Sequence, residues 1–364
     1  MILHDIISEL EKFAPLSYQE SYDNCGLLTG NKEMEISGAL LCLDCTEAIV
    51  EEAIQKKCNL IIAHHPIIFG GLKKINGSNY VERTIIKAIQ NNIAIYACHT
   101  NLDNVHSGVN KKIADKLGLI NTRILAPKKS LLKKLVTFVP SSHLELVRAD
   151  LFNAGAGNIG NYSQCSFINE GKGTFRPNEF SNPFSGTKGE LSIENETRLE
   201  VIYETINESQ IISALKQNHP YEEVAFDIYQ LENTYQNIGS GMIGNLETPI
   251  PEREFLERLK SIFKVKFIKH TDFLNKPIKT VSLCGGSGSF LLKNAINSKS
   301  DIYISSDFKY HEFFDADNKI LVADVGHYET EQFTPEIFYE IISNKFPTFA
   351  SYLTETNTNP VNYF

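Results

Sequence analysis

The sequence lacks the features that mark membrane proteins and nucleic-acid binders. No stretch approaches the roughly 18 consecutive apolar residues that a membrane span requires. Basic residues do not dominate either, since 35 Lys and Arg stand against 44 Asp and Glu, giving a formal net charge of -9. That balance works against binding duplex DNA or another polyanion through bulk electrostatics. We therefore expect no membrane partner and no nucleic-acid partner.

A disulfide framework and an export signal are also lacking. The seven cysteines are odd in number and scattered through the chain, unlike the paired cysteines of small secreted domains. Cys42 and Cys45 have C-x-x-C spacing, but there is no second pair and a predicted strand contains them, which favours buried core thiols over a zinc or redox motif. Residues 1–16 resemble an amphipathic helix with mixed charges rather than a signal peptide. A cytoplasmic location is expected.

The chain is long enough for two or three units, and its first part alternates between helices and apolar strands. This rhythm predicts a layered α/β sheet. The strands are apolar without alternation, as expected when helices cover both faces of a sheet. The predicted elements are helices at 3–14, 46–57 and 80–91 and strands at 38–45, 59–65 and 93–100.

A similar rhythm returns from about residue 252, after a stretch rich in Gly, Asn and Ser. We therefore predict a discontinuous α/β core at 1–130 and 232–364, interrupted by an inserted α+β domain at 131–231. In the second half of the core we expect helices at 252–263, 290–298 and 335–345 and strands at 278–284, 301–305 and 319–325. In the insert we expect helices at 143–153 and 208–218 and strands at 135–139, 162–168, 198–204 and 224–230.

Candidate metal ligands first appear as a histidine pair, His64 and His65, at the end of an apolar strand that Pro66 stops. Adjacent side chains of an extended backbone point to opposite sides, so the two histidines rarely bind the same ion. Each can instead bind one of two ions that lie close together. Taken alone, such a pair is more often structural or on the surface, because imidazoles commonly satisfy local hydrogen bonds.

A second cluster, His99 and Asp103, follows another apolar strand. Loops at the carboxyl ends of buried strands are where open α/β sheets place ligands. Asp103 would be a hard oxygen ligand, although a role in capping an Asx turn would explain it equally well in isolation. His99 either binds metal itself or orients Asp103.

A third cluster, His327 and Glu331, follows the apolar strand at 319–325. If the segment forms one helical turn, the two side chains face the same direction, and a carboxylate can bridge two ions. An ordinary surface pair at this spacing is the common alternative.

The three clusters together predict a site for two divalent ions, because each follows a buried strand of the same discontinuous core. The ligands would be His64, His65, Asp103, His327 and Glu331. This donor set suits Zn, Mn, Fe, Co or Ni, and paired ions are a known hydrolytic arrangement. The segment Gly285-Gly-Ser-Gly-Ser289 lies between a predicted strand and a predicted helix of the same core. It would form either a phosphate-binding loop or a tight turn.

These motifs run nearly end to end and resemble the NIF-three-like dinuclear-metal family, also known as GTP cyclohydrolase I type 2 homologues. The segments that carry the resemblance are Tyr22-Asp-Asn-Cys-Gly-Leu-Leu28, Ala63-His-His-Pro66, His99-Thr-Asn-Leu-Asp103 and Gly326-His-Tyr-Glu-Thr-Glu331. The insert resembles the PII-like or CutA-like α+β domain, of the ferredoxin-like kind, that longer members carry.

The resemblance implies specific roles. It assigns His65 and Asp103 to one ion and His64 and His327 to the other, with Glu331 as the bridge. It also implies a homohexameric ring whose sites face an interior cavity, and a nucleotide such as GTP as substrate.

Two positions depart from the family pattern. Tyr22 stands where tryptophan is usual, and Ser305-Ser306-Asp307 replaces the usual Thr-Gly-Asp near His311.

Two functions are compatible with these observations. In the first, the protein is a metal-dependent hydrolase in which His99 or His311 moves protons, since imidazole titrates near working pH. In the second, it is a non-enzymatic protein that stores, delivers or senses metal. The insert would then be a regulatory module, and His219-Pro-Tyr-Glu-Glu223 would contribute to its ligand site or simply join a helix to a strand.

Overall fold

The computed structural model describes residues 1–364 and divides them into two compact units. The first unit combines Met1–Pro127 with Gln236–Phe364, and the second consists of Lys128–Tyr235. The expected insert, residues 131–231, lies wholly within the second unit. The chain therefore leaves the first unit once and returns to it once.

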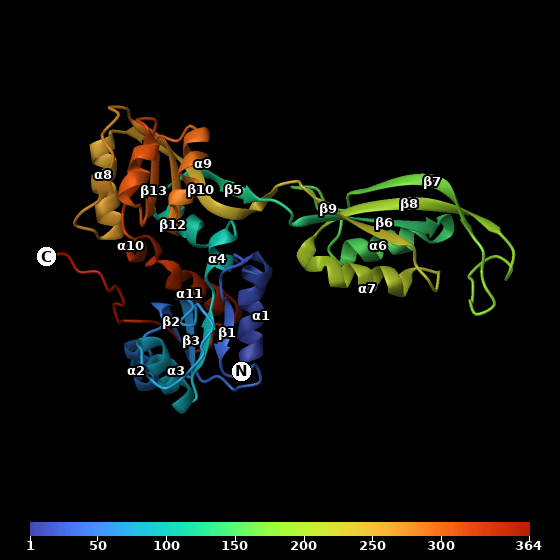
Figure 1. Ribbon diagram of the computed structural model, residues 1–364, viewed down its shortest axis with the longest axis horizontal. Helices are drawn as coiled ribbons and strands as arrows, with labels where there is room; N and C mark the ends of the chain where they lie inside the picture. The colour runs from blue at the N-terminus through green and yellow to red at the C-terminus, as the bar shows by residue number, and fades with distance from the viewer. The chain divides into compact units, whose positions relative to one another are not determined.

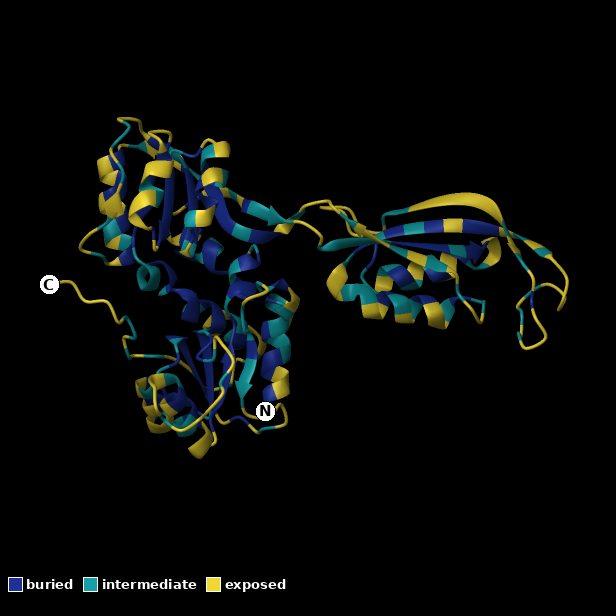
Figure 2. Ribbon diagram, in the orientation of Figure 1, coloured by how far each residue is buried: buried dark blue, intermediate teal, exposed yellow.

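The first sheet of the first unit has five strands in the order β1-β4-β3-β2-β15. Its strands are β1 (Gly26–Thr29), β2 (Ala39–Asp44), β3 (Leu60–His65), β4 (Ala94–Ala97) and β15 (Ser351–Leu353). All neighbours are parallel except β1, which is antiparallel to β4. Helices α2 (Glu47–Gln55) and α3 (Tyr80–Gln90) pack on one face, and α11 (Thr334–Lys345) with α1 (Leu3–Phe13) covers the other (Figure 1). The strand interiors are consequently buried on both sides (Figure 2).

The second sheet has six strands in the order β11-β14-β13-β12-β10-β5. Its strands are β5 (Ile120–Lys128), β10 (Tyr235–Ile250), β11 (Lys269–His270), β12 (Ile278–Ser287), β13 (Ile302–Ser306) and β14 (Leu321–Asp324). Its longer helices are α8 (Glu252–Phe263) and α9 (Leu292–Asn297). Strand β5 comes from the first half of the chain, whereas β15 near the C-terminus joins the first sheet. The two halves of the discontinuous core are thereby interlocked.

The second unit has the strand and helix order β6-α6-β7-β8-α7-β9. Its elements are β6 (Leu132–Pro140), α6 (Leu144–Asn153), β7 (Ser166–Phe175), β8 (Ser192–Glu204), α7 (Glu208–Asn218) and β9 (Phe226–Leu231). The sheet order is β7-β8-β6-β9 with antiparallel neighbours throughout, which is the ferredoxin-like topology. Both helices lie on the same face of the sheet (Figure 1), where residues such as Leu135, Val147 and Leu215 form the core.

The predicted α/β core with an α+β insert is confirmed. The core contains two sheets. Strands β1, β5, β11 and β15 were not predicted, nor was the long strand β10. Glycines at positions 239, 241 and 244 interrupt its pattern, and glycine in a strand weakens the sequence signal. All seven cysteines are free, and Cys42 and Cys45 are buried as expected. None of the helices is long and apolar enough to cross a membrane.

Candidate metal centre

The predicted ligands lie at the carboxyl ends of parallel strands from both sheets of the first unit. Strand β3 ends at His65, and β4 leads through His99 into the short helix α4 (Thr100–Asn104), which carries Asp103. From the second sheet, β14 leads into α10 (His327–Glu331). The predicted single helical turn is therefore confirmed, and the edges of the two sheets bring the side chains together.

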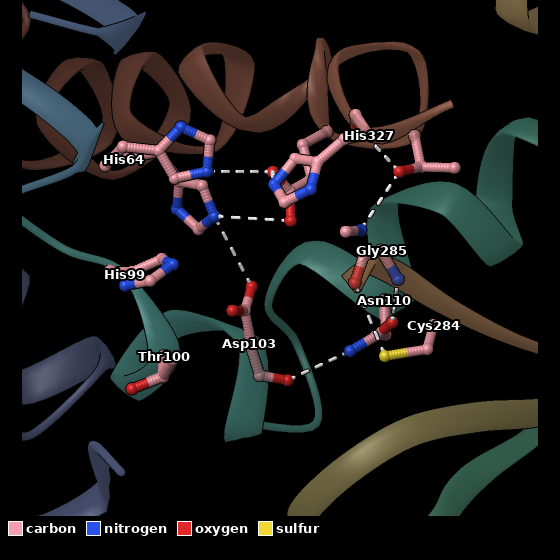
Figure 3. Close-up of polar contacts among 12 residues, drawn as sticks. His64, His99, Thr100, Asp103, Asn110, Cys284, Gly285 and His327 are labelled. Atoms are coloured by element: carbon pink, nitrogen blue, oxygen red, sulfur yellow. Dashed lines mark hydrogen bonds and ion pairs between the residues drawn. The ribbon is translucent and has the colours of Figure 1, made fainter. Parts of the chain in front are cut away.

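The ligand atoms form two overlapping groups that share Glu331. One group is His64, Asp103 and Glu331, the other is His65, His327 and Glu331, and within each group the atoms lie within 4.8 Å of one another. His99, the alternative ligand, forms a further group of this kind with His64 and His65. Glu331 Oε1 is 3.8 Å from His64 Nε2, whereas Oε2 is 3.0 Å from His65 Nε2 and 3.1 Å from His327 Nε2. One carboxylate thus spans both groups. Figure 3 shows the site from the side on which His64, Asp103 and His327 are labelled.

This grouping differs from the pairing that the resemblance implied, in which His65 went with Asp103 and His64 with His327. His64 Nε2 lies 3.6 Å from Asp103 Oδ1, while the ring of His65 is 5.4 Å from that of His327. Both imidazoles face Glu331 on α10, and His64 also faces Asp103 on α4.

Each imidazole of the cluster is held through Nδ1 by an oxygen acceptor. The acceptors are Cys98 O for His64 (2.9 Å), Asp44 Oδ1 for His65 (2.7 Å), Asp23 Oδ1 for His99 (2.8 Å) and Asp307 Oδ2 for His327 (2.6 Å). An Nδ1–H that donates to oxygen leaves the Nε2 lone pair available. Metal-binding histidines are held in this way, which fixes their tautomer and ring orientation.

Two buried polar atoms of the cluster have no hydrogen-bond partner in the protein. They are His64 Nε2 and Asp103 Oδ1, which face each other at 3.6 Å. Buried polar atoms without partners are rare because desolvating them costs free energy. A divalent cation bound by both atoms would remove that cost, so the residues present fit a metal ion.

The charges of the cluster also fit a cation. Burial lowers the pKa of His64 to about 4, so this imidazole is neutral. Burial alone would lower the pKa of His65 as well, but hydrogen bonds with Asp44 and Glu331 raise it to about 10. The pKa of His327 rises to about 9 against burial, chiefly through Glu331. Protons on His65 and His327 thus balance the carboxylate of Glu331, and a metal ion would compete with those protons for the same Nε2 atoms.

The glycine-rich segment that begins at the end of β12 allows close approach to Glu331. Gly286 has φ +61°, and a Cβ at this position would collide with Glu331 Oε1. The N–H of Gly285 donates to Asn110 Oδ1 at 2.9 Å, and that of Gly286 donates to Thr330 Oγ1 at 3.0 Å. Both amides already donate hydrogen bonds to side chains of the protein. The geometry therefore favours a tight turn over a phosphate-binding loop.

Ser305 and Ser306 support this turn. Both are buried, and their hydroxyls donate to the carbonyl oxygen of Gly286 at 3.0 and 2.6 Å.

The cluster opens on a cavity of about 500 Å³. Its lining includes Tyr22, Ser240, Cys284, Ser287 and Phe290 together with Asp103, His327 and Glu331. The size is that of a small-molecule site. The ligands therefore border a space that a substrate or water can enter.

The two histidines predicted to move protons have different positions. The His99 ring lies 5.1 Å from that of His64 and borders the cavity, but its Nδ1 bonds to Asp23 rather than orienting Asp103. His311 lies on the exposed 3-10 segment Tyr310–Ala316 and packs against Tyr310 and Phe314. The structure does not bring His311 into the cluster.

Sequence reasoning missed the carboxylates that orient the histidines. Asp23 is buried and also accepts hydrogen bonds from the amide and hydroxyl of Thr100. Asp44 ends β2 beside the ligand-bearing strand, and Asp307 follows β13. Their position at strand ends, next to strands that end in histidine, was the available signal.

The fold and the cluster define an α/β protein with a histidine-rich candidate metal centre at the meeting of two sheet edges. The profile of the Duf34/NIF3 (NGG1p interacting factor 3) family matches residues 1–360. The chain therefore belongs to this family, as its motifs predicted.

Relatives match over the full chain. A Bacillus subtilis protein named GTP cyclohydrolase 1 type 2 homolog is 38% identical, covering 98% of this chain and 97% of its own length. A Staphylococcus epidermidis protein of the same name is 36% identical over the whole of both chains. Among solved structures, a Bacillus cereus protein related to NIF3 matches with a TM-score of 0.85 at 36% identity, covering 100% of this chain and 99% of its own.

Proposed function

We propose that the site binds two divalent metal ions per chain and that the protein is a metal-dependent hydrolase acting on a nucleotide. The observation that carries the proposal is the position of Glu331, whose two oxygens face two different groups of ligands. The name of the relatives, GTP cyclohydrolase 1 type 2 homolog, supports GTP as the first substrate to examine.

In this proposal His64 and Asp103 would hold one ion, His65 and His327 would hold the other, and Glu331 would contribute to both sites. Nitrogen and carboxylate donors of this kind suit Zn, Mn, Fe, Co or Ni. Bound ions of this type lower the pKa of water and polarise an oxygen of the substrate.

The remaining residues of the cavity bind the substrate and move protons. His99 borders the cavity with its ring held by Asp23, which suits a proton acceptor that must keep a fixed orientation. The rings of Tyr22 and Phe290 are 65% and 66% exposed and offer apolar faces to a purine base.

Turnover assays test this proposal directly. Metal-loaded wild-type protein should consume GTP or another nucleotide, His65→Ala should lose nearly all of that activity, and His99→Gln should lower kcat while retaining metal. Asp115→Asn, at an exposed side chain, is the matched surface control. A metal-loaded protein that consumes no nucleotide, or a His65→Ala variant as active as wild type, would overturn the hydrolase proposal.

One observation favours the second candidate, a protein that stores, delivers or senses metal. The cavity lining includes Glu20, Asp103 and Glu331 but no Lys or Arg, so neither of the side chains that commonly bind phosphate is available to a nucleotide there. Metal exchange separates the two candidates. Ions that pass readily to a mild chelator favour delivery, whereas ions retained through many turnovers favour catalysis.

We also propose that the chain forms a homohexamer, which rests on the resemblance to the family. The chain mass is 41.0 kDa. Light scattering should therefore give about six times that mass, and a monomer at micromolar concentration would contradict the proposal.

A further inference from the structure

The second unit contains a cavity that is separate from the metal centre. It has a volume of about 340 Å³, within the range of small-molecule sites. Its walls come from the ends of β6 and β7, from the loop at 176–185, from Glu196 on β8, and from the segment after α7. All of these residues belong to the insert, so the cavity belongs to one unit.

A curved aromatic wall forms one side of this cavity. Tyr221 is central, with its ring centroid 6.2 Å from that of Phe175 and 6.1 Å from that of Phe184. The ring planes are tilted by 53° and 48°. Rings in contact at such angles cannot hold a flat base between them, because sandwiching needs two parallel faces set apart. They do present a continuous π surface to a compact group.

A buried carboxylate lies beside this wall. Glu196 is 9% exposed, and its Oε1 accepts a hydrogen bond from the Tyr221 hydroxyl at 2.8 Å. Its Oε2 extends over Gly173, where a Cβ would collide with it. No Lys or Arg forms an ion pair with Glu196, so its partner within the chain is a neutral hydroxyl. Burying a carboxylate without a cation is costly, which suggests that a cation supplied from outside completes the site.

The charged residues in the rest of the lining are also mostly negative. Glu222 and Glu223 also border the cavity, against a single guanidinium, that of Arg176. Three carboxylates to one cation disfavour an anionic ligand. Ser185 Oγ, also in the lining, is buried without a hydrogen-bond partner and is available to a polar group of the ligand.

The sequence explains how the wall is positioned. Pro220 ends α7 after His219, whose Nε2 bonds to the carbonyl oxygen of Phe138 at 3.0 Å. The amide of Tyr221 then donates to His219 Nδ1 at 3.1 Å. The His-Pro-Tyr-Glu-Glu segment is thereby fixed as a wall of the cavity.

We propose that this cavity binds a small organic ammonium ion. The positive nitrogen pairs with Glu196 and lies against the faces of Phe175, Phe184 and Tyr221, since aromatic faces attract cations. A compact cation satisfies the lone carboxylate and needs no parallel slot. A planar base or an anion would not meet both conditions.

The test compares choline with 3,3-dimethyl-1-butanol, which has the same shape but lacks the charge, by isothermal titration calorimetry on the full-length protein. Choline should bind saturably, and the neutral alcohol should bind at least about tenfold more weakly. Glu196→Gln and Phe184→Leu should each weaken choline binding by about tenfold. Glu170→Gln, an exposed residue on β7, should not change it.

Folding of each variant is checked by its thermal unfolding and by its metal content. Phe184 is 52% exposed, so its replacement should leave the unit folded even if Glu196→Gln does not. Equal binding of choline and the neutral alcohol would overturn the proposal. So would the absence of choline binding at 10 mM in wild type, or a folded Phe184→Leu protein that binds choline as wild type does.

Discussion

Asp44 Oδ1 accepts a hydrogen bond from His65 Nδ1 at 2.7 Å, which fixes the tautomer of that imidazole and directs its Nε2 at Glu331. The other oxygen of Asp44 accepts a hydrogen bond from the Thr358 hydroxyl at 2.7 Å. The C-terminal segment is therefore tied to the same carboxylate that orients a metal-ligand candidate.

Replacing Asp44 should weaken metal binding without removing any ligand. We expect Asp44→Asn to lower metal affinity about 10- to 100-fold, because partners that orient ligating histidines have effects of this size. Competition with a chromogenic chelator measures the change. Asp115→Asn should leave the affinity unchanged, and an Asp44→Asn protein with wild-type affinity would show that the hydrogen bond does not orient a ligand.

Gly286 should tolerate no side chain. With φ +61° and Glu331 Oε1 in the space of a Cβ, Gly286→Ala both strains the backbone and displaces the shared carboxylate. We expect it to lower metal content sharply and to destabilise the protein by about 1 kcal/mol or more. Elemental analysis and thermal unfolding give the two readouts.

Gly71→Ala is the matched control for this substitution. Nothing lies within 4 Å of a Cβ at Gly71, and its φ is not in the left-handed region. It should therefore retain wild-type metal content. If Gly286→Ala also retained it, the close approach to Glu331 would not matter for binding.

The five ligand candidates were predictable because each lies at or just beyond the end of an apolar strand. A buried strand that ends in His64 and His65, or leads into Asp103 or His327, is a local pattern that a sequence shows directly. Which ligand faces which could not be predicted. It depends on how β3 of one sheet packs against α10, which follows β14 of the other sheet. The residues that meet there are more than 260 positions apart in the sequence.

The two sheets were harder to predict than the helices. Strand β5 pairs with β10, which lies beyond the insert in the sequence. Strand β15, near the C-terminus, pairs with β2. Such pairings leave no periodic trace in either segment, because the pattern of a strand reports burial and not the identity of its neighbour. The orienting carboxylates Asp23 and Asp44 were missed for the same reason.

Glu52 should make the attachment of the C-terminal segment depend on pH. Burial alone would raise its pKa, but hydrogen bonds from the hydroxyls of Thr354 and Thr356 and the amide of Glu355 lower it to about 2. A carboxyl whose pKa falls on folding adds stability above its unfolded value of about 4.3 and loses it as the pH falls toward 2.

Thermal unfolding between pH 3 and pH 7 tests this expectation. Glu52→Gln should unfold a few degrees below wild type near pH 7, and the difference should shrink as the pH falls below about 4. Glu51→Gln, on the exposed side of the same helix, should show little effect because surface ion pairs contribute little. A difference that is constant with pH would indicate that the ionised carboxylate of Glu52 is not what holds the segment.

Elemental analysis of protein purified without added metal, run beside Glu331→Ala, tests the central claim most directly. Glu331 is the one residue shared by both ligand groups, so its loss should affect both ions. The account predicts about two divalent ions per wild-type chain and a sharp fall in the variant. No metal in either protein, or equal metal in both, would contradict a dinuclear centre bridged by Glu331.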